Sequence, residues 1–388
     1  MLSAPMRVAL VTNIVAPYRL PTWRALAKRC GEVHVFACAE REPNRVWNVE
    51  LPKGEQQLKV HVLPGLHGFM RHRDWGIHFN PGLWYAMAKV RPTHVLVTGY
   101  DTPSYWMAML YAKRQGIPLT LWWGSHDLSS RSRRGIACAV RRQATSMADT
   151  FVTYGQLASQ QLLSLGVPPN RIVTGINAVD AETIGRLVDN QRDHESRISG
   201  TGCVRFLFVG QFLERKGVRE LLEAFSYVSP EAASLTIVGY GPLEAELRSM
   251  VANKGMANVH FAGRTTTLSE AARYYAEADV FVMPSLVEVW GLVVNEALAS
   301  GLYALASNRA GATPDLIQLA PVEVGRSFDP GDPEDFRDAL LQAIERVRSG
   351  IDRQAIARWG RANTPERYAA KIHEALILAT ELRNSRRC

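Results

Sequence analysis

The chain has 388 residues, of which 47% are hydrophobic and 21% are charged, a composition typical of a globular protein that excludes a disordered one. Its length exceeds what one hydrophobic core usually supports, so two domains are expected. No apolar stretch approaches the roughly 18 residues of a membrane span, and Val8 to Ile14 is too short for a signal peptide. The five cysteines contain no CxxC pair. This argues against a zinc ribbon or a disulfide framework and favours a reduced, cytoplasmic chain.

Positive charge is concentrated in the first half of the chain. Residues 1–200 carry 24 Lys and Arg against 14 Asp and Glu, whereas residues 201–388 carry 21 against 23. A basic half predicts an anionic partner such as phospholipid, a phosphorylated acceptor or nucleic acid. Nucleic acid is disfavoured because no recognised binding motif accompanies the charge.

The densest basic cluster surrounds the apolar stretch 136–140 and follows Trp122 and Trp123. Two interpretations of it stay open: a helix lying on a membrane surface, or an ordinary solvated helix face. The cluster comprises Arg131, Arg133, Arg134, Arg141 and Arg142.

Strands and helices alternate along the chain in two sets. Strands predicted in the first set cover 7–12, 33–38, 60–63, 94–98, 119–123, 150–153 and 172–174, with helices at 20–29 and 104–115. The polar stretch 180–202 is interpreted as a linker. Strands predicted in the second set cover 204–209, 235–238, 259–262 and 280–283. Buried parallel strands separated by helices predict an α/β fold of two doubly wound domains, with ligands bound beyond the carboxyl ends of the strands.

The strand ends of the second set carry residues suited to a nucleoside diphosphate. Glycines there permit close backbone approach, arginine and lysine can neutralise phosphate, and the turn at 239–242 can flank a planar base. An ordinary structural turn explains any one of these strand ends, but their convergence predicts a nucleotide-diphosphate cleft. The residues concerned are Gly210, Arg215, Lys216, Gly239, Gly241 and Arg264.

Two carboxylates, Glu288 and Glu296, lie eight residues apart around Gly291. The pattern places Glu288 in the loop after the strand 280–283 and Glu296 in the helix that follows. A helix N-terminus offers backbone N–H groups to an anion. A carboxylate one or two turns further on can accept hydrogen bonds from ribose hydroxyls. In isolation the pair would be two ordinary helix acids.

In combination, the motifs from 208 to 328 resemble the C-terminal domain of the GT-B glycosyltransferases of family 4, which are retaining transferases with an E-x7-E motif. The first half resembles the family more loosely, through Asn13, residues 16–19, 165–168 and 177–180. The resemblance implies two Rossmann-like domains that face a central cleft, with a C-terminal helix crossing back. The implied parts are an acceptor-binding domain at 1–180, a linker at 181–203, a nucleotide-sugar-binding domain at 204–364 and the returning helix at 365–388.

The resemblance also implies roles for individual donor-side residues. Glu296 would bind the ribose hydroxyls, Glu288 would contact the donor sugar, and Lys216 would neutralise the diphosphate. The backbone of Gly291, Leu292 and Val293 would meet the diphosphate. Gln211 stands where the family usually has an arginine, with Arg215 as the candidate substitute.

On the acceptor side, the resemblance implies that Asn13, Pro17, Tyr18 and Arg19 face the acceptor and the donor phosphates. His126 stands where many relatives carry a histidine near the anomeric carbon. Asp127 is then either its orienting partner or an N-cap for the next helix. Tyr303 replaces a proline common in the family, a change expected to be structural.

The implied reaction moves a hexose from a UDP- or GDP-sugar to an acceptor hydroxyl with retained configuration. No Asp-x-Asp pair occurs in the sequence, so no metal and no other cofactor is expected. The expected setting is bacterial surface polysaccharide or lipopolysaccharide assembly in the cytoplasm, with a lipid-linked or saccharide acceptor and peripheral contact with anionic membrane. The alternatives are a soluble secondary-metabolite acceptor, a nucleotide-sugar epimerase, and a non-catalytic nucleotide-sugar-binding subunit.

Overall fold

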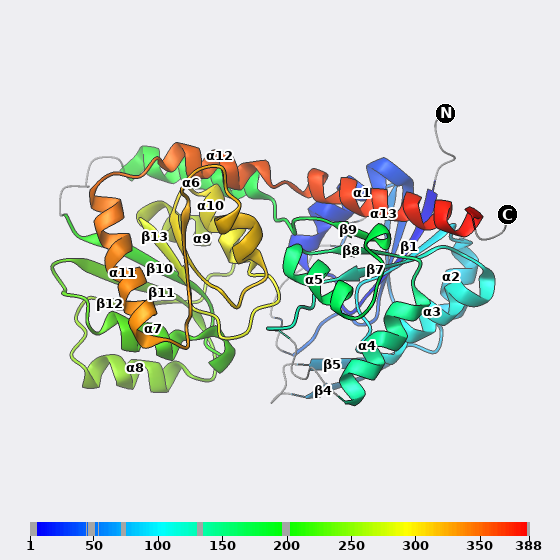
Figure 1. The fold of residues 1–388 in the computed structure, drawn as a ribbon, viewed down its shortest axis with the longest axis horizontal. Helices are drawn as coiled ribbons and strands as arrows, with labels where there is room; N and C mark the ends of the chain where they lie inside the picture. The colour runs from blue at the N-terminus through cyan, green and yellow to red at the C-terminus, as the bar shows by residue number, and fades with distance from the viewer. Residues whose placement is uncertain are drawn as a thin grey trace. The chain divides into compact units, whose positions relative to one another are not determined.

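The computed structural model describes residues 6–43, 45, 51–52, 54–70, 75–129, 135–195 and 202–385. The chain forms two compact units (Figure 1). Unit 1 combines Met1–Ile176 with Pro365–Cys388, and unit 2 is Asn177–Thr364. Three arginines of the predicted basic cluster, Arg131, Arg133 and Arg134, lie outside the described residues.

Unit 1 contains a parallel sheet of seven strands in the order β3-β2-β1-β6-β7-β8-β9. Its strands are β1 (Met6–Thr12), β2 (Gly31–Ala37), β3 (Leu58–Val62), β6 (His94–Val97), β7 (Leu119–Trp123), β8 (Thr150–Thr153) and β9 (Ile172–Thr174). A separate antiparallel hairpin, which the sequence pattern did not predict, pairs β4 (Leu66–Met70) with β5 (Trp75–Phe79).

The helices of unit 1 pack on the seven-stranded sheet. The last helix of the chain lies against the first, and it also contacts β7, β8 and β9. These helices are α1 (Leu20–Cys30), α2 (Leu83–Val90), α3 (Pro103–Gln115), α4 (Ile136–Met147), α5 (Gln156–Ser164) and α13 (Pro365–Ser385).

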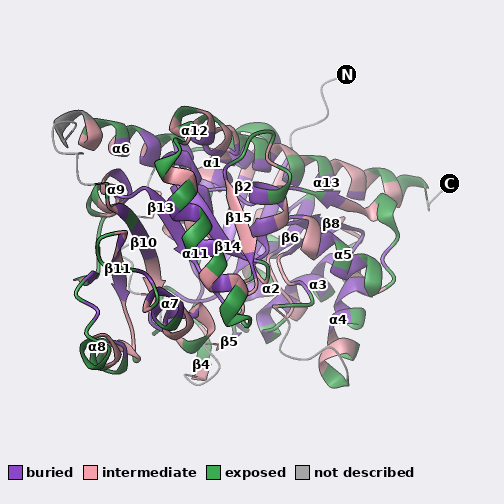
Figure 2. Cartoon of the chain, turned by 60° about the vertical axis from the view of Figure 1, so that its left-hand side comes forward, coloured by how far each residue is buried: buried purple, intermediate pink, exposed green. Residues whose placement is uncertain are grey.

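Unit 2 contains a parallel sheet of six strands in the order β12-β11-β10-β13-β14-β15. The inner strands β13 and β14 are buried along their whole length because helices cover both faces of the sheet, as the purple of β13 shows in Figure 2. The strands are β10 (Val204–Gln211), β11 (Ala233–Tyr240), β12 (Val259–Gly263), β13 (Val280–Met283), β14 (Tyr303–Ser307) and β15 (Gly325–Phe328).

Among the helices of unit 2, α7 contacts α8 and α11, while α6 contacts α9, α10 and α12. Local signals explain several helix starts: Thr267 caps α9 by accepting from the Glu270 amide, and Asp332 caps α11, which has Pro333 in its first turn. The helices are α6 (Ala181–Glu195), α7 (Val218–Phe225), α8 (Glu244–Asn253), α9 (Leu268–Glu277), α10 (Leu292–Ala299), α11 (Pro333–Arg348) and α12 (Arg353–Ala362).

The predicted α/β fold with two Rossmann-like domains is confirmed, whereas the predicted linker at 181–203 differs from the structure. Its first part is helix α6, which packs within unit 2. Ala181, Ile184 and Val188 are buried and follow a helical spacing, so they form one apolar stripe in an otherwise polar segment. The polar residues between them concealed this stripe.

In both sheets, the first strand in the sequence is an inner strand. β1 lies between β2 and β6, and β10 lies between β11 and β13. The chain adds strands on one side and then returns to add strands on the other. Such a topological switch point is where doubly wound sheets bind ligands, beyond the carboxyl ends of the strands. The loops after β1, β6, β10 and β13 are therefore the first places to look for a site.

A glycine holds together the loops after β10 and β13. Gly217 has φ +68°, and a Cβ built there would lie 1.9 Å from the Pro284 carbonyl oxygen. Only glycine combines this left-handed backbone with so close an approach. The loop after β10 can thus lie directly against the loop after β13.

The change Gly217→Ala is expected to lower the free energy of unfolding by about 3 kcal/mol or more, because it adds a steric clash to left-handed strain. Gly255→Ala is the matched control: its φ is +62°, but nothing lies within 4 Å of the added Cβ. The control should lose only about 1 kcal/mol. Urea unfolding of both variants measures the difference. Equal losses would contradict the close approach at Gly217.

His94 ties the sheet of unit 1 to α13. Its Nε2 lies 2.7 Å from Thr380 Oγ1. Burial, reinforced by His373, lowers the pKa of His94 from 6.5 to about 4. Because the folded pKa lies below the unfolded value, this neutral imidazole contributes stability above pH 6.5 that is lost as pH falls toward 4.

His94→Gln should therefore lose less stability than the wild type between pH 7 and pH 4, by up to about 3 kcal/mol. Denaturant unfolding of the full chain at several pH values measures this. His260→Gln, at an exposed histidine, is the control and should follow the wild type. If His94→Gln and the wild type lose stability in parallel, His94 does not carry the acid sensitivity.

Candidate active site

An ion pair joins the two strand exits that flank the switch point of unit 2. Lys216, in the loop after β10, donates a hydrogen bond to Glu288 Oε2 in the loop after β13. Arg215 Nη1 lies 4.0 Å from the same oxygen. The Lys216 and Glu288 side chains are 19% and 12% exposed, so water screens the pair only partly. The structure therefore brings together three of the predicted donor-side residues.

The backbone around Glu288 is held from two sides. On one side, the Leu286 and Val287 amides donate to the Arg215 carbonyl at 2.9 and 3.2 Å. On the other, the Gly311 amide donates to the Glu288 carbonyl at 3.3 Å, within an isolated parallel bridge between Glu288 and Ala310. The carboxylate is thus presented from a braced loop, where an arriving anion would compete with it for the two cations.

Gly291 opens the helix that follows Glu288. Its φ is +99°, and a Cβ there would lie 2.6 Å from Met283 Sδ, so this position requires glycine. Helix α10 begins directly after it at Leu292, with Val293 in its first turn. The first amides of a helix lack intrahelical acceptors and carry the positive end of the helix dipole. The predicted placement of Glu288 in a loop and Glu296 in a helix is confirmed.

Glu296 on α10 is fixed by the neighbouring helix α9. The buried Tyr275 hydroxyl donates to Glu296 Oε2 at 2.8 Å. Burial raises the pKa of Glu296, and the Tyr275 hydrogen bond opposes this rise only in part. Sequence reasoning missed Tyr275, because no motif in its helical stretch distinguishes it from the adjacent Tyr274.

Three polar side chains form a row at the ends of β10, β11 and β12. Gln211 and Tyr240 are register partners at the ends of adjacent strands, and Gln211 Nε2 donates to the Tyr240 hydroxyl at 3.4 Å. The Arg264 guanidinium lies 5.3 Å from the centre of the Tyr240 ring. Gln211, which stands where the family usually has an arginine, therefore contacts Tyr240. Arg215, the candidate substitute for that arginine, is a cation 4.0 Å from Glu288.

The predicted donor-side glycines have structural reasons of their own. A Cβ at Gly239 would lie 1.8 Å from the Gly210 carbonyl oxygen, and one at Gly241 would lie 2.5 Å from the Phe212 carbonyl oxygen. These glycines allow the loops after β10 and β11 to pack on each other. Tyr303 is likewise built into the fold: it begins β14 and donates to Glu323 at 3.1 Å.

In unit 1, aromatic rings surround Arg19. Its guanidinium carbon lies 4.7 Å from the centre of the Trp122 ring, 4.9 Å from Tyr154 and 5.5 Å from Tyr18. Arg19 also donates to the Tyr154 hydroxyl at 2.5 Å. Cation–π contacts of this kind fix the cation in place. Pro17 starts the short 3-10 turn that carries Arg19.

The basic segment near residue 141 differs from a membrane-surface helix in two respects. Trp122 and Trp123 are buried in β7 and belong to the core. Arg141 is also buried, and its Nε donates to the Tyr100 hydroxyl at 3.2 Å. Of the arginines described on α4, only Arg142 is exposed. The part of the cluster that the structure describes is therefore closer to an ordinary helix face.

Asn13 and His126 follow β1 and β7. Asn13 Nδ2 donates to Glu42 Oε1 at 2.8 Å. The His126 side chain is only 1% exposed, so its contact with a sugar stays a prediction. Asp127 accepts from Gln161 at 3.0 Å. Of the two roles predicted for Asp127, that of N-cap for the next helix is wrong, because Gly135 is the N-cap of α4. Its role as an orienting partner of His126 stays a prediction.

Within the described ranges, no helix is long and apolar enough to cross a membrane. The same residues contain no group of three or more His, Cys, Asp or Glu side chains arranged to hold a metal ion.

In a comparison with known proteins, both units match sequence models of glycosyl transferases. Residues 203–346 match the sequence model of the glycosyl transferases group 1, and residues 15–177 match that of the glycosyl transferase 4-like domain. Anabaena HepE, solved in complex with UDP and glucose, has a TM-score of 0.68 at 15% identity, covering 96% of this chain and 99% of that one. At this identity the structural likeness shows the fold alone.

Curated relatives match over shorter stretches. The sulfoquinovosyl transferase of Arabidopsis thaliana is 42% identical over 125 residues, which are 31% of this chain and 23% of the relative. The amylovoran biosynthesis glycosyltransferase of Erwinia amylovora is 27% identical over 178 residues, which are 44% of this chain and 42% of the relative. The chain thus spans less than half the length of either relative. With both family matches and the GT-B fold, the chain belongs to the family 4 glycosyltransferases.

Proposed function

We propose that the chain transfers a hexose from a UDP- or GDP-sugar to an acceptor hydroxyl with retention of the anomeric configuration. The observation that carries this proposal is the placement of Arg215 and Lys216 around Glu288 at the switch point of unit 2. A site that must stabilise a departing diphosphate needs fixed cations and helix N-terminal amides. Arg215 and Lys216 supply the cations, and the start of α10 at Leu292 supplies the amides.

In the proposed reaction, the bond between the anomeric carbon and the diphosphate oxygen breaks as the acceptor oxygen bonds to that carbon on the same face. The acceptor proton passes to the departing diphosphate, so no strong enzymic base is required. Lys216 and Arg215 neutralise the charge that develops on the diphosphate. Glu288, once displaced from Lys216, hydrogen-bonds hydroxyls of the donor sugar. On this account the protein's own cations serve the leaving group and no metal is needed.

The remaining donor contacts follow from the fixed side chains. Glu296, held by Tyr275, accepts from the ribose hydroxyls. The row of Gln211, Tyr240 and Arg264 is suited to the base, because an aromatic ring and a guanidinium both offer flat surfaces. His126 remains a candidate for contact with the donor sugar.

For the acceptor, we propose a saccharide or lipid-linked hydroxyl in bacterial surface polysaccharide or lipopolysaccharide assembly. The name of the Erwinia relative, an amylovoran biosynthesis glycosyltransferase, supports this setting. Asn13, Tyr18 and Arg19, in the loop after β1, would face the acceptor. Peripheral contact with anionic membrane, on the cytoplasmic side, is consistent with the excess positive charge of the first half.

Incubation of the full chain with UDP-glucose, UDP-galactose, UDP-N-acetylglucosamine and GDP-mannose tests the activity. With octyl glycosides of glucose, galactose and mannose as acceptors, the wild type should release nucleoside diphosphate and form a glycoside from at least one donor, in the presence of EDTA. Lys216→Ala should lower kcat about 100-fold or more, because it removes a charge-stabilising donor.

Lys254→Ala is the matched control, since Lys254 pairs with Glu223 at 2.8 Å on the surface of the same unit. It should retain wild-type activity. Equal activity of Lys216→Ala and Lys254→Ala would remove the proposed role of the ion pair. An absence of diphosphate release from every donor would count against the transferase.

Tyr275→Phe should weaken binding of UDP or GDP about fivefold, because Glu296 loses the hydrogen bond that orients it. That bond also lowers the pKa of Glu296 against the effect of burial. Without the bond, Glu296 should take up its proton at a higher pH. As the pH is lowered, nucleotide binding by the variant should therefore begin to weaken before binding by the wild type does. Calorimetric titration measures both effects, with Tyr274→Phe on the same helix as control. An affinity unchanged at every pH would show that Tyr275 does not act on Glu296.

A further inference from the structure

Asn13 is the end of a chain of hydrogen bonds that runs into unit 1. Its Nδ2 donates to Glu42 Oε1 at 2.8 Å, and His78 Nε2 lies 3.0 Å from the same oxygen. On its other side, His78 Nδ1 lies 3.1 Å from His67 Nδ1. Glu42 and His78 are 7% and 2% exposed, whereas His67 is at the surface. A buried carboxylate thus connects the loop after β1 to the hairpin β4–β5.

The chemistry of the groups gives the hydrogen bonds to Glu42 a direction. An ionised Glu42 can only accept, so His78 donates from Nε2. One proton then lies between His78 Nδ1 and His67 Nδ1, because one of the two nitrogens must donate and the other accept. Burial alone would raise the pKa of Glu42, but the bonds from His78 and Asn13 outweigh it and the pKa lies below its ordinary value. Each of the three hydrogen bonds that join Asn13, Glu42, His78 and His67 thus has a donor and an acceptor.

The hairpin end of this chain is rigidly attached. The His78 carbonyl accepts from Thr102 Oγ1 at 2.8 Å and from Ser104 Oγ at 3.1 Å, both at the start of α3. A Cβ at Gly76 would lie 2.8 Å from Glu42 Oε1, so the hairpin backbone lies directly against the carboxylate. His78 is therefore held by its backbone as well as by its ring, and Glu42 has little freedom to turn.

The contacts of Asn13 define which of its groups are left for a ligand. One amide N–H is used by Glu42, and Thr12 Oγ1 lies 3.4 Å from Oδ1. A carboxamide has two N–H donors and two lone pairs. Among the described residues, one of each is therefore left, in an orientation that Glu42 fixes, because the carboxylate can accept but cannot donate. Without this acceptor, the amide could reverse its oxygen and nitrogen.

We propose that Glu42, supported by His78, is a positioning residue that orients the Asn13 carboxamide toward the acceptor hydroxyl. The proposal rests on the proposed function, in which the loop after β1 faces the acceptor. Glu42 does not touch the reacting atoms. Its effect passes through Asn13, so it should raise the acceptor KM by a larger factor than it lowers donor hydrolysis.

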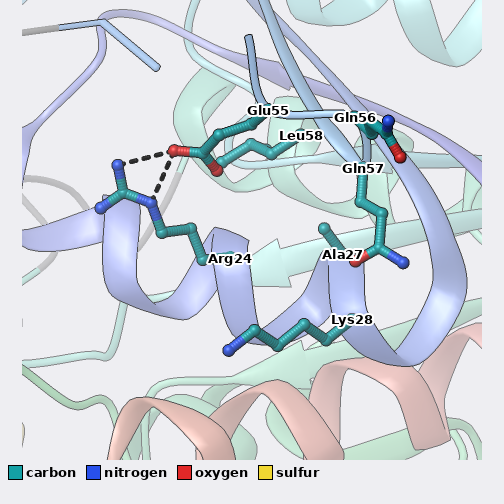
Figure 3. A pocket seen from close by; sticks show the side chains of 7 residues that line it. All are labelled: Arg24, Ala27, Lys28, Glu55, Gln56, Gln57 and Leu58. Carbon is teal, nitrogen blue, oxygen red and sulfur yellow. Dashed lines mark hydrogen bonds and ion pairs between the residues drawn. The ribbon is translucent and has the colours of Figure 1, made fainter. Parts of the chain in front are cut away.

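A double-mutant cycle on the full chain tests this. Glu42→Asp keeps the charge but draws the carboxylate back by about 1.5 Å. The variants Asn13→Ala, Glu42→Asp and their combination are compared in acceptor KM, using the octyl glucoside, galactoside and mannoside, and in donor hydrolysis without acceptor. The control is Glu55→Asp, whose carboxylate pairs with Arg24 at 2.8 Å at an open groove beside α1 (Figure 3).

Asn13→Ala and Glu42→Asp should each raise the acceptor KM about fivefold to tenfold, with donor hydrolysis within about twofold of wild type. The combination should be no worse than the more severe single variant. Glu55→Asp should stay near wild type.

Additive effects in the combination would overturn the proposal. So would a fall in donor hydrolysis that parallels the loss of transfer, since a purely structural role predicts that result. Failure of the proposed function is distinct from both outcomes, because it would appear as no diphosphate release by the wild type.

Discussion

The candidate donor site depends on one contact between two loops, the ion pair of Lys216 with Glu288. The two loops leave the neighbouring strands β10 and β13, between which the strand order of the sheet changes direction. Gly217 allows the first loop to lie against the Pro284 carbonyl, and the Arg215 carbonyl accepts two amides from the second. The backbone thus places two cations around one carboxylate before any ligand arrives. Such preorganisation is what a site for a charged leaving group requires.

The two units apply the same topology to different chemistry. In unit 2, the strand exits carry cations, a carboxylate pair and a helix N-terminus. In unit 1, the corresponding exits carry Arg19 among aromatic rings and Asn13 on the buried carboxylate of Glu42. In each unit a polar side chain of the site is oriented by a buried, hydrogen-bonded partner: Tyr275 orients Glu296 in unit 2, and Glu42 orients Asn13 in unit 1. Partners of this kind keep a side chain in one rotamer and reduce the freedom that a ligand would have to remove.

The fold class of the second unit, four of its six strands and the loop positions of its site could be predicted from the sequence, because they rest on local signals, whereas β14 and β15 were not predicted. Continuous apolar runs mark buried parallel strands, and the motif around Gly291 places Glu288 in a loop and Glu296 in a helix. Helix α6 was missed because its apolar stripe is narrow and the rest of the segment is polar. The hairpin β4–β5 was missed for a different reason: its strands are partly exposed and lack a continuous apolar run.

The partners of the site residues could not be predicted, because they come from distant parts of the chain. Tyr275 reaches Glu296 from another helix, and Glu42 reaches Asn13 across 29 residues. For Trp122, the neighbouring residues in the sequence suggested an environment that the structure does not give it. Its position before an arginine-rich stretch kept a membrane-surface helix open as one of two interpretations, but the tertiary fold buries it beside Arg19. The environment of such a buried side chain is set by residues from other parts of the chain, so its neighbours in the sequence did not predict it.

The most direct test of the central claim is a crystal structure of the full chain with UDP or GDP bound. The account predicts that the diphosphate displaces Glu288 from Lys216, with a phosphate oxygen within hydrogen-bonding distance of Lys216 Nζ and the ribose hydroxyls on Glu296. A nucleotide bound elsewhere, with the ion pair of Lys216 and Glu288 intact, would contradict it.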